Sequence, residues 1–476
     1  MNDGTTIGGW IQGFEGITDM PTEEPLHSFP EILSWLKERK LHQQVQIEMI
    51  SLHECSPWYY DEAEGCIRNR DGSFFSISGL EADCPDGKVL SQPVIVQQEI
   101  GYLGILCRKI GGIWHFLMQA KIEPGNINYV QISPTIQATK SNFTRRHGGK
   151  EPPYLSLFRR MRREDILVDQ IQSEQSSRFW GKRNRNVILR TEEDIPELPS
   201  HRWMTLRQIR ECMKQDNLVN MDTRTVLSCM PYVFMMNSIH GYTPEFVRSM
   251  QAIRHPDITD IHLRINNYKM FQAPTLRSTP LSALKDWEWT ESAFRHKKLA
   301  PFQVVFCRLN IEDREVTRWT QPLFASLGMA TFGLFCRIRE GALQVLIRIQ
   351  PEIGCFDSVE LGPSVQEEYG LESLRDSVAI SFFEASSHPD QVLMDVVMSE
   401  EGGRFYHEQN RNILLMAKGS GPDYDPERYI WVSLGTLNAL TQINNCLNIQ
   451  LRNLLMLLSM RASQPEEGGF QNDTHQ

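Results

Sequence analysis

Two polar stretches of this sequence carry side chains that could perform acid–base chemistry on an anionic ligand. The first, TKSNFTRRHGGK at residues 139–150, mixes cations with hydroxyl and amide donors and closes with a glycine pair. Guanidinium and ammonium groups neutralise a diphosphate, and glycines let the backbone approach it. The candidate ligand contacts in this stretch are Thr139, Lys140, Ser141, Asn142, Arg145 and His147. The alternative interpretation is a solvated basic loop without a ligand.

The second stretch occurs twice. DQIQSEQSSRFWGKRNRNVILR at 169–190 returns as DVVMSEEGGRFYHEQNRNILLM at 395–416. One interpretation places Glu174 and Arg178 as an ion pair on a helix surface, with the asparagines in turns. Such solvated pairs contribute only ~0–1 kcal/mol, so duplicated units would be expected to lose them. A pattern present in both copies therefore indicates a buried polar network or a ligand site.

The two copies differ in charge, and this difference favours the first copy as the phosphate-binding one. Lys182 and Arg183 are replaced by Glu408 and Gln409, and the basic loop is replaced by EEYGLE at 367–372. Cations attract a diphosphate, whereas carboxylates repel it. The candidate first-copy contacts in the repeated stretch are Gln172, Ser173, Glu174, Arg178, Trp180, Arg183 and Arg185; those of a second, degenerate pocket are Gln366, Glu400, Arg404 and Arg411. For Trp180, base stacking competes with a role in an apolar core.

The repeat extends over most of the chain and predicts two homologous folding units. LSQPV at 90–94 matches WTQPL at 319–323, SPTIQ at 133–137 matches GPSVQ at 362–366, and WMTL at 203–206 matches WVSL at 431–434. A solenoid would need at least three short repeats, so two large units are the better interpretation. We place the first unit at residues 1–232, a connecting segment at 233–274 and the second unit at 275–476.

Local patterns predict that each unit combines strands with helices. Gly111 and Gly112 separate two apolar runs, which is typical of a β-hairpin. Alternation of apolar and polar residues over 343–349 predicts a strand. Thr205 and Gln208 have the spacing of a capping box and predict the start of a helix. The run ILVDQIQSEQ at 166–175 fits either a helix or a strand.

Composition restricts the class of protein. The 476 residues are 41% hydrophobic and carry a net charge of -10, which is typical of a globular protein and disfavours a general nucleic-acid binder or a membrane-surface protein. We find no secretory signal and no apolar run long enough to span a bilayer. The ten cysteines form no C-x-x-C pair. This usage favours reduced thiols in a cytoplasmic protein and predicts neither a zinc site nor a disulfide framework.

The runs SPTIQATKSNFTRRHGG, LVDQIQSEQSSRFWGKRNRN and NMDTRTVL, together with the two-unit layout, resemble the NDP-hexose 2,3-dehydratases of deoxysugar biosynthesis. The resemblance implies an α/β fold of two tandem Nudix-hydrolase-like domains, each a mixed sheet flanked by helices. It also implies a homodimer in which only one of the two nucleotide-sugar pockets per subunit is active. The Nudix signature is absent, so metal-dependent diphosphate hydrolysis should be lost. Lys140 and Phe143 depart from the Arg and Tyr that are usual in the family.

The implied substrate is dTDP-4-keto-6-deoxy-glucose, and the implied reaction removes water across C2 and C3 in the biosynthesis of deoxysugars for natural products such as antibiotics. Our candidate roles are His147 as the base, Glu174 as the general acid, and Lys140 or Arg145 at the oxyanion or the diphosphate. We expect no metal and no redox cofactor, and a 3-ketoreductase should consume the unstable diketone. The alternatives are a Nudix-type nucleotide-sugar hydrolase and a non-catalytic nucleotide-sugar binding protein.

Overall fold

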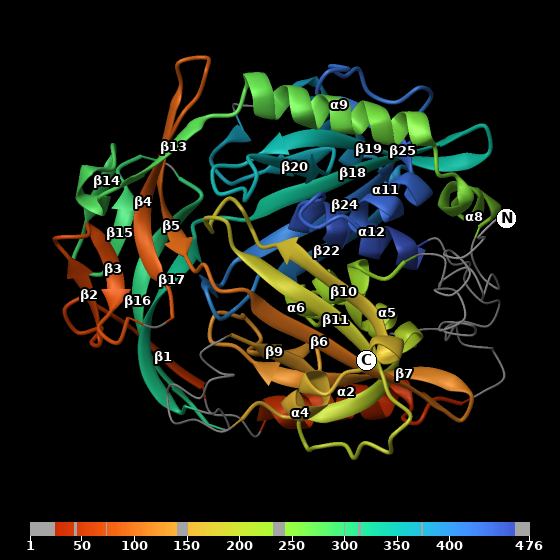
Figure 1. The fold of residues 1–476 in the computed structure, drawn as a ribbon, viewed down its shortest axis with the longest axis horizontal. Helices are drawn as coiled ribbons and strands as arrows, with labels where there is room; N and C mark the ends of the chain where they lie inside the picture. Colours follow the sequence, from red (N-terminus) through yellow and green to blue (C-terminus); the bar gives the residue numbers. More distant parts are fainter. Residues whose placement is uncertain are drawn as a thin grey trace, which may run out of the picture.

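Two seven-stranded sheets with the same strand order form the centre of the computed structural model (Figure 1). The structure describes residues 24–41, 45–72, 74–139, 151–231, 243–298, 300–312, 316–372 and 375–461. The first-copy sheet runs β10 (Ile166–Ser173), β11 (Arg183–Arg190), β6 (Gly101–Ile110), β7 (Ile113–Ile122) and β12 (His201–Thr205), with β8 (Val130–Ser133) beside β7 and β9 (Ile136–Ala138) beside β6. The second-copy sheet runs β22 (Val392–Ser399), β24 (Gln409–Met416), β18 (Ala330–Arg339), β19 (Ala342–Pro351) and β25 (Tyr429–Ser433), with β20 (Val359–Gly362) beside β19 and β21 (Val365–Glu367) beside β18.

The repeated polar stretch has the same secondary structure in both copies, as predicted. β10 pairs with β11, and β22 pairs with β24, in each case antiparallel across a connecting loop. Asn184 stands opposite Gly101 in the parallel pair β11–β6, and Asn410 stands opposite Ala330 in β24–β18. The ambiguous run 166–175 therefore contains a strand. The interpretation of Glu174 and Arg178 as a helix-surface pair is wrong, because both are buried in the loop after β10.

The other local predictions are confirmed. Gly111 and Gly112 join β6 to β7 with φ of 60° and 90°, values that suit glycine. The Thr205 hydroxyl accepts from the Gln208 backbone N–H. The Gln208 side-chain oxygen accepts from the Thr205 backbone N–H, which completes the capping box of α5 (Leu206–Met213). Residues 343–349 lie in β19, whose alternating apolar side chains are buried.

Each copy also has a smaller sheet that includes one strand from the other copy. The five-stranded sheet runs β13 (Thr275–Thr279), β4 (Ser76–Asp83), β3 (Cys66–Asn69) and β2 (Trp58–Asp61), with β5 (Val89–Val96) beside β4. The six-stranded sheet runs β14 (Trp287–Trp289), β15 (Ala293–His296), β16 (Phe302–Ile311), β17 (Arg318–Ser326) and β23 (Phe405–Tyr406), with β1 (Val45–Ile50) beside β16. The first copy thus donates β1 to the second copy and receives β13 in return. The sequence repeats are therefore not physically separate bodies.

Helices cover the sheets and join the copies. They are α2 (Phe29–Leu41), α4 (Leu155–Arg159), α5, α6 (Met221–Ser228), α8 (Pro244–Gln251), α9 (His255–Phe271), α10 (Ser377–Ser386), α11 (Leu434–Thr441) and α12 (Ile449–Arg461), with short 3-10 turns at Arg163–Asp165 and Leu281–Ala283. Helices α6 and α12 pack against each other, and each also packs on the sheet of its own copy. The largest apolar core accordingly mixes residues of both copies.

Buried arginines tie the two copies together. Arg224 on α6 donates to the Ser399 carbonyl at 2.7 Å, and Arg452 on α12 donates to the Ser173 carbonyl at 2.6 Å. Each central helix therefore holds the end of the motif strand in the opposite copy. Charge-assisted bonds between buried groups are stronger than neutral ones, so these contacts fix how the copies sit against each other.

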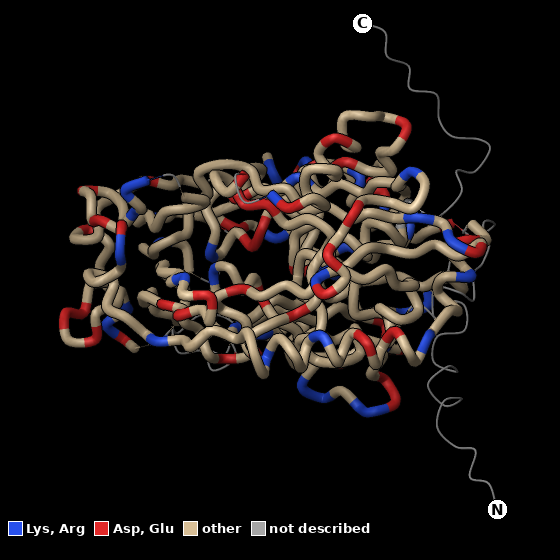
Figure 2. Tube along the Cα trace, turned by 90° about the horizontal axis from the view of Figure 1, so that it is seen from above, with Lys and Arg blue, Asp and Glu red and all other residues tan. Residues whose placement is uncertain are grey.

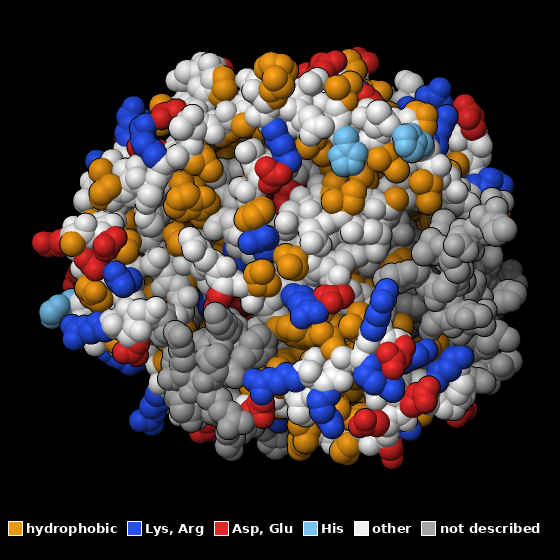
Figure 3. Space-filling view, viewed as in Figure 1, with side chains coloured by type: hydrophobic (Ala, Val, Ile, Leu, Met, Phe, Trp, Pro, Cys, Tyr) orange, Lys and Arg blue, Asp and Glu red, His pale blue; other side chains and the backbone are white. Residues whose placement is uncertain are grey.

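Charges of both signs are mixed over the described parts of the molecule that Figures 2 and 3 show. Lys and Arg alternate with Asp and Glu along the trace (Figure 2), and apolar side chains are scattered among charged ones over the face in Figure 3. Within the described ranges, no helix combines the length and the apolar character that are needed to cross a membrane.

Candidate active site

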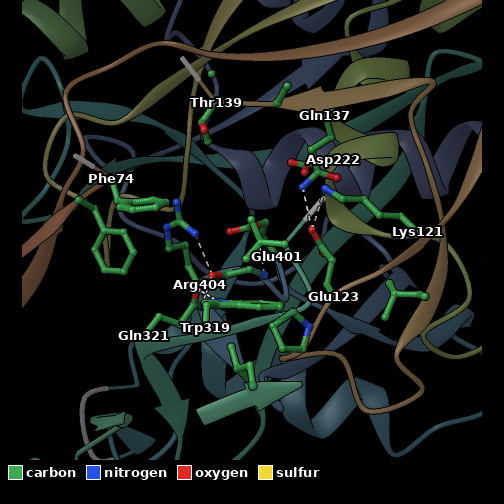
Figure 4. Close-up of a pocket in the computed structure, with 18 of the residues that line it drawn as sticks. Phe74, Lys121, Glu123, Gln137, Thr139, Asp222, Trp319, Gln321, Glu401 and Arg404 are labelled. Atoms are coloured by element: carbon green, nitrogen blue, oxygen red, sulfur yellow. Dashed lines mark hydrogen bonds and ion pairs between the residues drawn. The ribbon is translucent and has the colours of Figure 1, made fainter. Parts of the chain in front are cut away.

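A cavity of about 1550 Å³ lies where the first-copy sheet meets the two smaller sheets (Figure 4). The start of β6, the ends of β7 and β9 and the loop after β10 line it from the first copy. The second copy contributes β17 and the loop before β23. The polar and aromatic residues that line it include Phe74, Gln97, Lys121, Glu123, Gln137, Thr139, Glu174, Lys182, Asn184, Asp222, Trp319, Gln321, Glu401 and Arg404.

Glu174 is the lining residue best suited to donate a proton. The Asn184 amide donates to its Oε2 atom. Its Oε1 atom is buried and accepts no hydrogen bond from the described residues. Burial, and then the nearby Glu401 carboxylate, raise the pKa of Glu174 to about 8. The carboxyl group is therefore protonated at neutral pH, and its Oε1 atom is buried at the wall of the cavity without a hydrogen-bond partner among the described residues.

Further carboxyl groups converge on the same end of the cavity. Glu123 accepts from Gln137 at 2.9 Å and pairs with Lys121 at 3.1 Å, and its other oxygen accepts from the Gly402 backbone N–H at 3.2 Å. Asp222 and Glu401 lie beside it (Figure 4). Burial raises the pKa of both Asp222 and Glu401. Among the described residues, no group of three His, Cys, Asp or Glu side chains has an arrangement that would hold a metal ion.

Cations and aromatic rings occupy another part of the wall. Lys182 donates to the Glu99 carbonyl at 2.7 Å, and burial lowers its pKa. Arg404 donates to Gln97 at 3.2 and 3.4 Å, and its guanidinium lies 4.5 Å from the centre of the Phe75 ring. Phe74 and Trp319 add aromatic faces beside these cations (Figure 4). Cationic and aromatic groups next to proton-donating carboxyl groups suit a ligand that combines a ring, a phosphate and a hydroxylated carbon skeleton.

The matching position in the second copy, called the second-copy site, is closed by its own ion pair. Strand register makes Glu368 the counterpart of Thr139, and the repeated stretch makes Glu408 the counterpart of Lys182. Arg178 reaches Glu368 at 2.6 Å and Glu408 at 3.7 Å, with 3% of its side chain exposed. Glu352 and Glu400 complete this site, and burial raises the pKa of both. Charges that would meet a ligand are paired within the protein.

The predicted residues Arg178 and Arg404 exchange places. Arg178, expected in the first pocket, lies in the second-copy site, whereas Arg404, expected in the second, lines the first cavity. The cause is the path of the loops that carry them. Gly354 accepts from Gly181 at 2.8 Å and donates to Ser176 at 3.0 Å, so the first-copy loop crosses to the second copy. The loop after β22 crosses from the second copy to the first.

Other predicted first-copy contacts belong to the interface between the copies. Gln172 donates to the Thr441 carbonyl and Ser173 donates to Glu360, each at 2.9 Å. The guanidinium of Arg183 lies 3.7 Å from the centre of the Phe356 ring. Trp180 packs against an apolar cluster that contains Leu80, Ala82, Val94 and Ile353. These side chains hold the two copies together and are absent from the cavity lining, unlike Thr139 and Glu174.

The remaining predicted residues divide into three groups. Arg185 and Arg411 form half-exposed ion pairs with Asp169 and Asp395. Gln366 donates to Glu352, and Glu400 accepts from Asn410, so both belong to the second-copy site. Lys140, Ser141, Asn142, Arg145 and His147 lie outside the described residues.

Sequence reasoning missed several lining residues for which a signal exists. Asp222 matches Gln450, and Lys121 matches Gln350, so both charges occur only in the first copy. The comparison that drew attention to Lys182 would have found them. Glu401 matches Gln175, so its charge occurs only in the second copy, and its relevance to the first cavity depends on the crossing of its loop into the opposite copy.

Comparison with known proteins gives consistent matches over nearly the whole chain. The family model described as NDP-hexose 2,3-dehydratase matches residues 30–230 and 259–458. A protein of Streptomyces violaceoruber is 37% identical, over 89% of this chain and 95% of its own length. One of Saccharopolyspora spinosa is 35% identical, over 90% of each chain, and one of Amycolatopsis orientalis is 33% identical, over 92% of each. All three are named dTDP-4-dehydro-6-deoxy-alpha-D-glucopyranose 2,3-dehydratase.

Proposed function

Because this chain belongs to the NDP-hexose 2,3-dehydratase family and is a carbon–oxygen lyase, we propose that its substrate is dTDP-4-keto-6-deoxy-D-glucose. The product is dTDP-3,4-diketo-2,6-dideoxy-glucose. The relatives that carry this substrate in their names match at least 89% of the chain, which supports the assignment.

The chemistry needs one proton acceptor and one proton donor on the sugar. The C4 ketone acidifies the C3 hydrogen, so a base removes that proton and leaves an enolate with its negative charge on the C4 oxygen. The electron pair then expels the C2 hydroxyl, which takes a proton from a general acid and leaves as water. The enol that remains, with its double bond between C2 and C3, becomes the diketone when C2 gains a proton and the C3 hydroxyl loses its proton.

We assign the general acid to Glu174, and its buried, unpartnered Oε1 atom in a residue that lines the cavity carries this assignment. The Asn184 donor satisfies Oε2, which leaves Oε1 to hold the proton and deliver it to the departing C2 hydroxyl. Burial keeps the carboxyl group protonated until it is needed. Glu400 has the same Asn partner, yet it lies in a site that Arg178 closes.

The base and the anion contacts are assigned to the basic loop. Thr139, the last described residue before the rest of this loop, lines the cavity, which supports the assignment. His147 is our proposed base, and Lys140 or Arg145 is proposed to stabilise the C4 oxyanion or the diphosphate.

Three further properties follow from the family resemblance. We propose that each copy is a Nudix-like α/β unit, a proposal supported by the identical strand orders and the helix packed on each sheet. We also propose a cytoplasmic homodimer, and a 3-ketoreductase that reduces the unstable diketone. Light scattering of the purified protein tests the dimer.

The decisive experiment incubates the protein with dTDP-4-keto-6-deoxy-glucose and a 3-ketoreductase and measures the mass of the trapped product. Loss of one water supports the proposal, and prior treatment with EDTA should leave the rate unchanged. Formation of a nucleoside monophosphate with Mg²⁺ would instead identify a hydrolase. Binding of dTDP without conversion of the sugar would identify a binding protein.

A further inference from the structure

We propose that Arg404, carried by the second copy, binds the β-phosphate of the nucleotide sugar in the first cavity. This inference rests on the proposed function for the class of ligand. It assigns a specificity-determining role to a residue outside the basic loop and outside the first half of the chain.

No described hydrogen bond joins Arg404 to a carboxylate, and burial favours the neutral form of the neighbouring Glu401 by raising its pKa. Its described side-chain hydrogen bonds go to neutral acceptors, the Gln97 amide oxygen and the Gly403 carbonyl. The guanidinium carbon lies 4.5 Å from the centre of the Phe75 ring, which helps to hold the side chain in place. Figure 4 shows the side chain projecting into the cavity beside Glu401. A guanidinium held by an aromatic ring at a cavity wall can form two parallel bonds to an oxyanion.

The second-copy site shows which kind of group completes this arrangement. Arg178 is the counterpart of Arg404 and lies 4.2 Å from the centre of the Phe302 ring, in the same way. There both oxygens of the Glu368 carboxylate face the guanidinium, at 2.6 and 3.4 Å. In the first cavity, Thr139 stands where Glu368 would be. The protein therefore supplies an anion to Arg178, and the position opposite Arg404 is left for an anion from the ligand.

The β-phosphate is the ligand anion that fits this position. It is attached to C1 of the sugar, next to the C2 hydroxyl that leaves. Lys182 and Glu401 each interact electrostatically with Arg404, and each also interacts with Glu174. Arg404 and Glu174 line the same cavity, and Arg404 projects into it beside Glu401 (Figure 4), which supports placing the phosphate of the neighbouring carbon at Arg404.

The test compares the binding of dTDP and dTMP by titration calorimetry, because dTMP lacks the β-phosphate. Arg404→Met should weaken dTDP binding by roughly 10- to 100-fold and leave dTMP binding within about threefold. Thr139→Glu reproduces the second-copy carboxylate in the first cavity. It should also weaken dTDP selectively, while the melting temperature stays at or above that of the wild type. Arg411→Met, which removes a half-exposed cation paired with Asp395, should change neither affinity.

Equal losses of dTDP and dTMP in Arg404→Met would overturn the proposal, as would normal dTDP binding by Thr139→Glu. A fall in kcat with both affinities unchanged would also overturn it and would assign Arg404 to the C4 oxyanion. Because the binding contrast needs no turnover, it separates this inference from the proposed function. If the wild type binds dTDP better than dTMP through Arg404 but never removes water, only the proposed function fails.

Discussion

The first cavity and the second-copy site are built on one plan and differ in where their charges are neutralised. In both, a buried Glu accepts from an Asn on the neighbouring strand, and an Arg arrives from the opposite copy over a Phe ring. In the second-copy site, Glu368 and Glu408 pair with that Arg. In the first cavity, Thr139 and Lys182 stand in their places. At these two positions the residue type decides whether the arginine is paired with carboxylates of the protein.

Contacts shared by the copies maintain the fold rather than the chemistry. The Trp58 indole donates to the Thr320 carbonyl at 2.9 Å, and its counterpart Trp287 donates to the Ser91 carbonyl at 3.2 Å. Both bonds join opposite copies, as do those of Arg224 and Arg452. This explains why duplicated polar residues can persist without a ligand. They satisfy buried groups that would otherwise cost free energy.

The largest expected effect is on turnover. Glu174→Gln should lower kcat by roughly 10²- to 10⁴-fold, because the amide has no proton to give to the leaving hydroxyl. Glu400→Gln, the matched change in the second-copy site, should stay within a few-fold of the wild type. Both rates are measured by mass spectrometry of the trapped product.

Equal losses in these two variants would show that both sites contribute to catalysis. The wild-type rate should also fall as pH rises through about 8, because the protonated form of Glu174 is then lost. Glu400→Gln should keep this pH profile, and its retention provides the control for a correctly folded cavity.

The next effect is on stability, and it should be larger for a change in the second-copy site than for a change in the first cavity. Arg178→Met should lower the free energy of unfolding by about 3 kcal/mol, because it leaves the largely buried Glu368 carboxylate without its cation. Arg404→Met removes bonds to neutral acceptors and should cost only about 1 kcal/mol. Urea unfolding curves followed by circular dichroism measure both. A larger loss in Arg404→Met would contradict the contrast between a closed site and an open one.

A smaller effect concerns the dependence of stability on pH. Burial raises the pKa of Glu408 to about 8, so the folded protein holds a proton that the unfolded chain releases above its ordinary pKa near 4.5. Stability should therefore fall as pH rises between about 5 and 8, and Glu408→Gln should reduce that fall. Melting temperatures across this range provide the measurement.

Lys182, the first-copy counterpart of Glu408, should have the opposite effect on how stability depends on pH. Burial lowers its pKa, so the folded protein binds fewer protons than the unfolded chain at alkaline pH. Lys182→Met should leave the slope of stability against pH unchanged between pH 5 and 7 and should remove the rise in stability that Lys182 causes above about pH 8. A change in the acidic range would contradict this assignment.

The smallest effect is expected for the half-exposed ion pair that both copies share. Arg185→Ala and Arg411→Ala each break a half-exposed ion pair with an Asp. Each should change the free energy of unfolding by less than about 1 kcal/mol, because solvent screens such pairs. Urea unfolding of both variants tests whether the copies respond alike.

The sequence alone determined the repeat, its local elements and the copy that keeps the cations. Turn glycines, apolar alternation and a capping box act over a few residues, so the hairpin at Gly111, the strand over 343–349 and the helix after Thr205 could be read directly. The comparison of copies also identified the charge change at Lys182. The family resemblance rested on runs of residues and needed no fold.

Only the tertiary structure decided which copy each functional side chain serves. Pairing β1 with β16 and β13 with β4 depends on contacts between residues far apart in the chain, which no local pattern specifies. The same crossing carries Glu401 and Arg404 into the first cavity and Arg178 out of it. Spacing in sequence fixes neighbours on one strand, but the burial of apolar surface between two copies fixes which loop completes which site.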